Sequence, residues 1–247
     1  MGLNEGQLVC RSMGMPNERA GSAATAILDG IARGDQIGGP TALARIVSES
    51  IAACGGLDVS DLTQRYLHWY QTDAFDTGPT FNLVFSRVAD GVNSADAAKQ
   101  IDLLLGGDTA GCGPAHRSGP IAACFEIPTF DLATVARTEA SITHYHPDAG
   151  SASAVVVLLC RYLLEGADWK EARARIAKDA TVADAWRAIQ GADLNPGGYA
   201  PDVIHSALHF LDGEDALEKA FDFAGGENFC PVIVGLVEGA MTYAYAE

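Results

Sequence analysis

The chain has 247 residues, of which 48% are hydrophobic and 19% are charged, a composition typical of a globular protein and unlike that of disordered or fibrous chains. It carries 32 acidic and 16 basic side chains, which gives a formal net charge of −16. The basic residues are scattered along the sequence, so a polyanion would approach an unfavourable field. We therefore expect no nucleic-acid partner.

The sequence shows no targeting or membrane segment. The most apolar stretch, 152–160, ends at Arg161 and is much shorter than the roughly 20 residues that a bilayer span needs. The N-terminal stretch lacks the apolar core of a signal peptide, and the six cysteines are too few and too scattered for a disulfide framework. These features predict a cytoplasmic protein without a membrane span.

Apolar residues recur at spacings of three and four along most of the chain, for example in 26–31, 62–70 and 203–211. This spacing predicts amphipathic helices, about ten in all with short connections. No linker-like run interrupts the sequence, so we expect an N-terminal segment over 1–20 and one all-α domain over 21–247.

Cap residues mark several expected helix boundaries. Asp131 and Asp168 stand where N-caps are expected, and Gly166, Gly191 and Gly213 stand where helices should end. Such residues satisfy or terminate the unpaired backbone groups at helix ends.

Glycine is abundant, with 27 residues, and 12 of them lie in four segments, 32–40, 104–120, 195–199 and 223–231. Glycine reaches backbone conformations closed to other residues and has no side chain to obstruct a ligand. The same residues also commonly end helices. Both interpretations are open for each segment, and four such segments in one helical chain favour ligand-binding loops.

Five segments, in this order, resemble motifs of the ADP-ribosylglycohydrolase family. They are ILDGIARGDQIGGP (27–40), LDVSDLTQRYLHWYQTDAFDTGPTF (57–81), GCGPAHRSGPI (111–121), ARTEASITHYHPDAGSASAVVVLLCRYLLEG (136–166) and GGENFCPVIVGLVEGAMTYAYAE (225–247). The resemblance implies a compact all-α bundle of orthogonally packed helices. It also implies cleavage of an N- or O-glycosidic bond of ADP-ribose with the help of two divalent metal ions.

The chain departs from the family at both metal-binding motifs. The family's Thr-Asp-Asp-Thr motif is shortened here to Gly-Gly-Pro-Thr, 38–41, which holds no carboxylate. The Gly-Gly-Asp-Thr-Asp-Thr motif is replaced by Gly-Gly-Glu-Asn-Phe-Cys, 225–230, which keeps one. Since hard cations need several oxygen ligands, we predict no metal site and no cofactor.

Two functions remain open after this loss. The chain could be a hydrolase that cleaves an N-glycosidic, amide or cyclic-amide C–N bond of a small ligand by metal-independent acid/base chemistry. Alternatively, it could be a non-catalytic ligand-binding or regulatory protein of the same family. The partner expected in both cases is a small molecule, and the sequence leaves the oligomeric state open.

Four residues are candidates for catalysis. Glu227 is the carboxylate left in the second metal motif, and it could serve as a general acid. His144 or His146 could act as acid or base with Asp148 to orient it, or could be a buried helix-capping histidine. Cys112 could be a nucleophile if a helix terminus or a nearby histidine lowers its pKa, or an inert residue in a tight turn.

A further set of residues is expected to contact the substrate, because these residues lie in the glycine segments or match the family's pocket-lining turn. Arg117 would suit a carboxylate or phosphate, with a salt bridge as the alternative. Capping of a turn is the alternative for the two aspartates. The set is Asp73, Asp76, Thr77, Gly111, Gly113, His116, Arg117, Gly225, Gly226, Asn228 and Cys230.

Overall fold

Helices form the regular structure of residues 18–227 and 229–246, the part of the chain that the computed structural model describes. These residues form thirteen α-helices and two 3-10 helices and no strand, which confirms the all-α class. The expected number of about ten helices was too low, because short helices such as α6 span too few turns to show a periodic pattern.

The helices in chain order are α1 (Glu18–Gly34), α2 (Gly39–Cys54), α3 (Val59–Thr72), α4 (Pro79–Ala89), α5 (Ser94–Leu104), α6 (Gly113–Arg117), the 3-10 helices η1 (Gly119–Ala123) and η2 (Thr129–Asp131), α7 (Leu132–Ser141), α8 (Pro147–Leu164), α9 (Trp169–Ile176), α10 (Ala183–Gln190), α11 (Ala200–Leu211), α12 (Ala216–Ala224) and α13 (Phe229–Ala246). The first helix thus begins slightly before the expected domain start at residue 21. Residues 1–17, most of the expected N-terminal segment, lie outside the described part.

The expected cap residues stand at helix ends. Asp168 accepts a hydrogen bond from the backbone N–H of Glu171 at 2.7 Å, which caps α9. Asp131 occupies the N-cap of α7 but makes no capping bond through its side chain. Gly166, with φ +91°, follows α8, and Gly191 follows α10.

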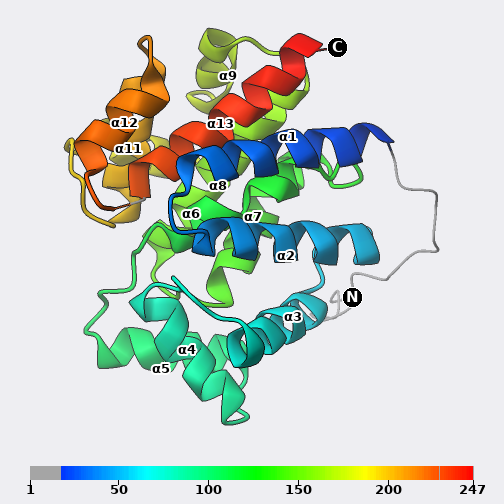
Figure 1. Ribbon diagram of the computed structural model, residues 1–247, viewed down its shortest axis with the longest axis vertical. Coiled ribbons are helices and arrows are strands. Elements are labelled where there is room, and N and C mark those ends of the chain that lie inside the picture. The colour runs from blue at the N-terminus through cyan, green and yellow to red at the C-terminus, as the bar shows by residue number, and fades with distance from the viewer. Residues whose placement is uncertain (1–17, 228, 247) are drawn as a thin grey trace.

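The first and last long helices, α1 and α13, lie side by side in Figure 1, with α2 below them. Glycines allow this close crossing. A Cβ on Gly235 would lie 2.2 Å from the carbonyl oxygen of Gly30, and a Cβ on Gly239 would lie 2.3 Å from that of Ala26. Only glycine fits at these points, because no real Cβ approaches backbone so closely.

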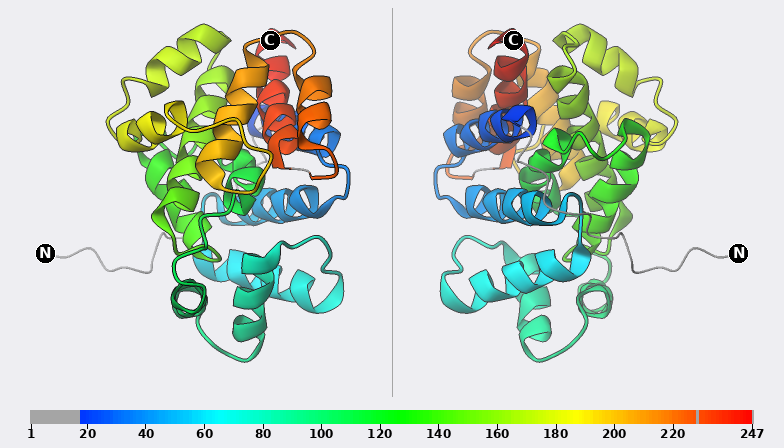
Figure 2. Two further views of the ribbon diagram at one scale, coloured as in Figure 1. Left: turned by 90° about the vertical axis from the view of Figure 1, so that its left-hand side faces the viewer. Right: turned by 90° about the vertical axis from the view of Figure 1, so that its right-hand side faces the viewer.

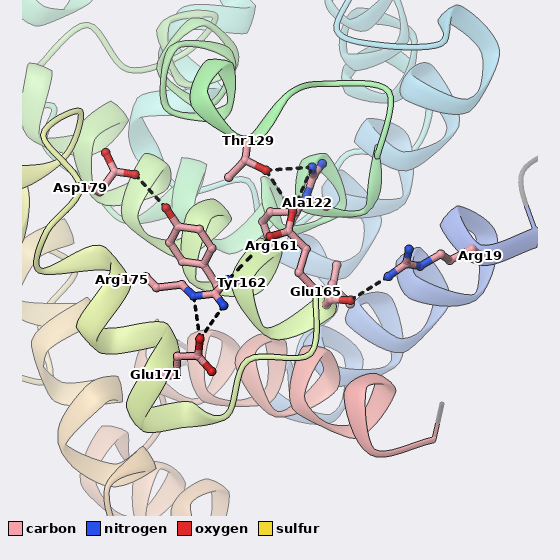
Figure 3. Close-up of polar contacts among 10 residues, drawn as sticks. Arg19, Ala122, Thr129, Arg161, Tyr162, Glu165, Glu171, Arg175 and Asp179 are labelled. Atoms are coloured by element: carbon pink, nitrogen blue, oxygen red, sulfur yellow. Dashed lines mark hydrogen bonds and ion pairs between the residues drawn. The ribbon is translucent and has the colours of Figure 1, made fainter.

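The helix α8 is the core helix of the bundle. It is the one described helix that is long and apolar enough to cross a membrane by length and composition, but 78% of that window is buried inside the protein. Near its end, the buried Arg161 donates a hydrogen bond to the carbonyl oxygen of Ala122 at 2.7 Å (Figure 3). It donates another to the carbonyl oxygen of Ile127 at 3.1 Å. These bonds tie the segment around η1 to the core.

The helices α3, α4 and α5 form the lower part of the molecule in Figures 1 and 2. Aromatic packing joins α3 to α4: Phe81 and Phe85 stack with ring centroids 4.5 Å apart, and Tyr66 meets both edge-on. The turn between these two helices lies beside the start of α2, where a Cβ on Gly38 would lie 3.3 Å from the Phe75 ring.

Substitution of Gly235 by alanine tests the crossing of α1 and α13. We expect Gly235→Ala to lower the free energy of unfolding by about 3 kcal/mol or more, because its methyl group would push backbone apart. The matched control is Gly21→Ala, at an exposed position near the start of α1 where a Cβ meets nothing within 4 Å. That variant should gain about 0.5–1 kcal/mol. Urea denaturation measures both, and equal effects would contradict the close-crossing account.

Candidate functional site

A cavity of about 230 Å³ lies where the glycine segments meet. Its walls come from 37–43, 76–81 and 111–117, together with His144, Gly198, Glu227 and Phe229. Its volume lies below the range of roughly 300–1,000 Å³ that is typical of ligand sites. A wider hollow of about 430 Å³ between α11, α12 and α13 holds none of the candidate residues.

The loop at 111–113 is fixed to a second glycine segment. An isolated β-bridge pairs Gly111 with Tyr199, in which the Cys112 N–H donates to the Gly198 carbonyl at 3.0 Å. The Ala200 N–H donates in turn to the Ala110 carbonyl at 2.9 Å. Two of the four glycine segments therefore form one wall of the cavity.

A buried ion pair lies behind this wall. Arg117 on α6 donates through Nε to Oε1 of Glu139 on α7 at 2.7 Å, and both side chains are almost fully buried. The Tyr66 hydroxyl donates to the same oxygen at 2.9 Å, and its ring lies 5.3 Å below the guanidinium. Arg117 also lines the cavity, and the salt bridge that was the alternative interpretation of this residue lies in the core and not at the surface.

The same arginine reaches His144 through Thr143. Arg117 Nη2 donates to the Thr143 hydroxyl oxygen at 2.8 Å, and this oxygen lies 2.7 Å from Nδ1 of His144. Burial, and then the charge of Arg117, lower the pKa of His144 from 6.5 to about 3. The imidazole is therefore neutral at physiological pH.

His116 is a second neutral imidazole in the cavity wall. Its Nε2 lies 2.8 Å from the carbonyl oxygen of Phe229 at the start of α13. Burial lowers the pKa of His116 to about 4, although the hydrogen bond to this carbonyl opposes the shift. His116 thus joins α6 to α13 as well as lining the cavity.

The two candidate thiols, Cys112 and Cys230, have raised pKa values and are therefore poor nucleophiles. Cys112 lines the cavity, but burial raises its pKa to about 12, opposite to the lowered value that a nucleophile needs. Burial also raises the pKa of Cys230 to about 12, and this residue does not line the cavity. Of the two alternatives left open for Cys112, the raised pKa favours the inert residue over the activated nucleophile, since desolvation of the thiolate is the larger effect.

Two carboxyl groups face the cavity, Asp76 from the turn before α4 and Glu227 from the segment before α13. Asp76 has a left-handed backbone with φ +48°, and its Oδ2 accepts a hydrogen bond from the Gly39 N–H at 3.3 Å. Burial raises the pKa of Asp76, and the negative charges of Asp35 and Glu227 raise it further. Asp35, Asp76 and Glu227 are therefore close enough for their charges to interact.

Asp35 is committed to the turn that starts α2. Its Oδ1 accepts from the N–H groups of Ile37 and Gly38, and its Oδ2 accepts from the N–H of Thr41 at 2.9 Å and from the Thr41 hydroxyl at 2.6 Å.

Within residues 18–227 and 229–246, no three His, Cys, Asp or Glu side chains are grouped to hold a metal ion.

Several expected site residues lie outside the cavity wall. His146 caps α8, where its Nδ1 accepts from the Asp148 N–H at 3.2 Å, and Asp148 accepts from the Tyr199 hydroxyl. Asp73, Gly225, Gly226 and Cys230 also lie outside the wall, and Asn228 is not among the described residues. His146 does not line the cavity because its side chain caps the start of α8. Thr77, Gly111 and Gly113 line the cavity as expected.

The sequence reasoning missed the groups that hold the site together, Tyr66, Glu139 and Thr143. One signal could have found Glu139. It continues the spacing of Ala136 and Ala140 on the buried face of α7, and a carboxylate on such a face requires a partner.

Removal of one member of the buried pair should be costly. We expect Arg117→Met to lower the free energy of unfolding by about 3–5 kcal/mol, because Glu139 would keep a buried charge without its partner. The control is Arg65→Met, which breaks the partly exposed pair with Asp61 and should cost about 1 kcal/mol or less. Similar losses in the two variants, measured by urea denaturation, would contradict a stability role for the buried pair.

The two buried imidazoles make stability depend on pH. The unfolded chain binds a proton at each near pH 6.5, whereas the folded chain does so only near pH 4 and pH 3. The contribution of the two neutral imidazoles to the free energy of unfolding is therefore fully present above pH 6.5. It is lost as the pH falls, by up to about 1.4 kcal/mol per pH unit for each group.

Urea denaturation at pH 7, 6 and 5 measures this loss, and His144→Gln should make the dependence shallower. A free energy of unfolding that stays constant from pH 7 to pH 5 would show that the imidazoles are not held neutral by burial.

Comparison with known proteins places the chain in a family. The ADP-ribosylglycohydrolase family model matches residues 5–242. A search of the curated proteins gives no match. A solved structure described as an ADP-ribosylglycohydrolase-related protein complex is similar in fold, with a TM-score of 0.67 at 23% identity over 91% of this chain and 88% of that chain. A match over nearly the whole length, on an all-α bundle with the family's motifs in order, shows that this chain belongs to the ADP-ribosylglycohydrolase family.

Proposed function

We propose that the protein binds a small ligand in the 230 Å³ cavity and hydrolyses a C–N bond of it by acid/base chemistry without the family's metal pair. The bond would be N-glycosidic, amide or cyclic-amide. The observation that carries this proposal is that two carboxyl groups, Asp76 and Glu227, face one small cavity and one of them has a raised pKa.

The loss of the metal pair is supported by the oxygen donors that remain. A hard divalent cation needs about six oxygen ligands, chiefly carboxylates. Asp35 has both oxygens engaged by the turn at the start of α2, and Asp76 accepts from Gly39. Since Phe229 and the segment 38–41 supply no carboxylate, the donor set does not fit two such cations.

The environment of Asp76 suits it to the role of general acid, which leaves the role of general base to Glu227. Asp76 retains its proton to higher pH than an ordinary aspartate, because it is partly buried near two other carboxylates, and this suits a general acid. Glu227 would take a proton from the attacking water. Asp76 would give its proton to the leaving nitrogen, and the water hydroxyl would bond to the carbon that loses the nitrogen.

A non-catalytic binding protein is the second candidate. It is favoured by the inert state of Cys112, His116 and His144, whose pKa values of about 12, 4 and 3 keep all three uncharged near neutral pH. On either proposal the partner is a small molecule, since the formal charge of −16 disfavours polyanions.

We infer a cytoplasmic location from the scattered cysteines and the lack of a signal-peptide core in the N-terminal stretch.

The test is hydrolysis of a panel of small nucleosides, cyclic amides and ADP-ribose, each assayed with and without a chelator. We expect turnover that survives the chelator, and a loss of about 10²–10⁴-fold in kcat for Glu227→Gln or Asp76→Asn. Asparagine suits the left-handed backbone at position 76, so that fold loss is not expected.

The control is Glu214→Gln on the exposed loop before α12, which should leave kcat unchanged. Turnover that requires Mg²⁺ or Mn²⁺ would contradict the proposal. Saturable binding of a panel compound without turnover would identify the protein as the binding protein of the second candidate.

A further inference from the structure

The hydrogen bonds behind the cavity determine which nitrogen of His144 carries its proton. A guanidinium has only donors, so Arg117 must donate to the Thr143 oxygen, at 2.8 Å. That leaves the single hydrogen of the Thr143 hydroxyl for one of two acceptors. They are His144 Nδ1 at 2.7 Å and the Ala140 carbonyl oxygen at 3.4 Å.

The shorter contact is the one with good geometry, since hydroxyl donors normally lie within about 3.0 Å of their acceptors. Donation from Nδ1 to the Thr143 oxygen would leave the hydroxyl hydrogen only the long contact to the Ala140 carbonyl. The geometry therefore favours donation from the Thr143 hydroxyl to Nδ1, and a neutral imidazole that accepts at Nδ1 carries its hydrogen at Nε2. The nearby guanidinium opposes a second proton on the ring, which agrees with the lowered pKa of His144.

The Nε2 edge of His144 faces space that glycines leave open. A Cβ on Gly111 would lie 3.4 Å from Nε2, and a Cβ on Gly113 would lie 3.4 Å from Cε1 and 3.9 Å from Nη1 of Arg117. His144 and Arg117 both line the cavity. An N–H donor and a cation therefore border the same part of the wall, and both suit an oxygen that carries negative charge.

We infer that His144 is a fixed hydrogen-bond donor to an acceptor oxygen of the ligand, such as the carbonyl oxygen of an amide or cyclic amide, and that Thr143 is the positioning residue that sets its tautomer. This inference rests on the proposed use of the cavity as the ligand site. His144 then neither takes nor gives a proton during the reaction. Its N–H stabilises charge on the carbonyl oxygen, while Asp76 and Glu227 transfer the protons.

The tautomer can be read directly from long-range ¹⁵N–¹H spectra of the ¹⁵N-histidine-labelled protein. The chain supplies both reference patterns. His116 Nε2 faces a carbonyl oxygen, so it must donate from Nε2, and His205 Nδ1 lies 2.9 Å from the Ile189 carbonyl, so it must donate from Nδ1. We expect His144 to show the His116 pattern from pH 5 to pH 8. The His205 pattern, or an imidazolium, would overturn the inference.

Two variants at position 143 separate positioning from packing. Thr143→Ser keeps the hydroxyl and should keep the Nε2–H pattern of His144. Thr143→Val keeps the shape but loses the donor, so His144 should populate both tautomers. An unchanged pattern in Thr143→Val would remove Thr143 from the mechanism. If this variant does not fold, the wild-type and Thr143→Ser spectra still decide the tautomer.

The ligand class is tested by titration with 2-pyrrolidone, a compact cyclic amide. We expect it to shift the His144 Nε2–H signal but not the His205 signals, and to bind about fivefold more weakly to Thr143→Val than to Thr143→Ser. If 2-pyrrolidone shifted the signals of His116, the other histidine in the cavity wall, but left those of His144 unchanged, the donor role would be overturned. If no cavity signal moves, the carbonyl ligand class is wrong, whereas the chelator and Glu227→Gln assays decide the proposed hydrolysis separately.

Discussion

The site depends on one buried ion pair, between Arg117 on α6 and Glu139 on α7. Two charges in a core are tolerated only when they are paired and hydrogen-bonded, so this pair fixes the short helix α6 against α7. Arg117 also anchors Thr143, and through it His144, while His116 one residue earlier joins α13. The position of each cavity side chain on this wall therefore follows from a constraint in the core.

Desolvation explains the chemistry of the wall better than residue type does. Histidine and cysteine are the usual acid/base and nucleophilic groups, but burial here keeps the ring of His144 neutral and the thiol of Cys112 protonated. The carboxyl groups of Asp76 and Glu227 line the same cavity from exposed segments. The buried part of the wall, from α6 and His144, therefore suits polar recognition, and the exposed carboxyl groups suit proton transfer.

Much of the fold could be predicted from the sequence. The three-and-four spacing gave the all-α class, Asp168 and Gly191 gave helix ends, and the ordered motifs gave the family. These features are local or shared by many chains, so one sequence displays them. Two residues of the glycine segments, Gly111 and Gly113, line the cavity, while the role of these segments in ligand binding stays a prediction.

The details of the site could not be predicted, because they depend on contacts between residues far apart in the chain. Nothing in the sequence separates His144, which faces the cavity, from His146, which lies two residues later and caps α8. The pairing of Tyr66 with Glu139, 73 residues away, is one such contact. Burial, which also arises from contacts between distant residues, is the largest cause of the pKa shifts of Cys112, His116 and His144.

The central claim, that this cavity works without a metal pair, is tested most directly by anomalous diffraction. Crystals would be grown with Mn²⁺ and 2-pyrrolidone, and data collected at the manganese absorption edge. The account predicts ligand density between Glu227 and His144 and no anomalous peak in the cavity. Two manganese peaks bound by Asp35, Asp76 and Glu227 would contradict it.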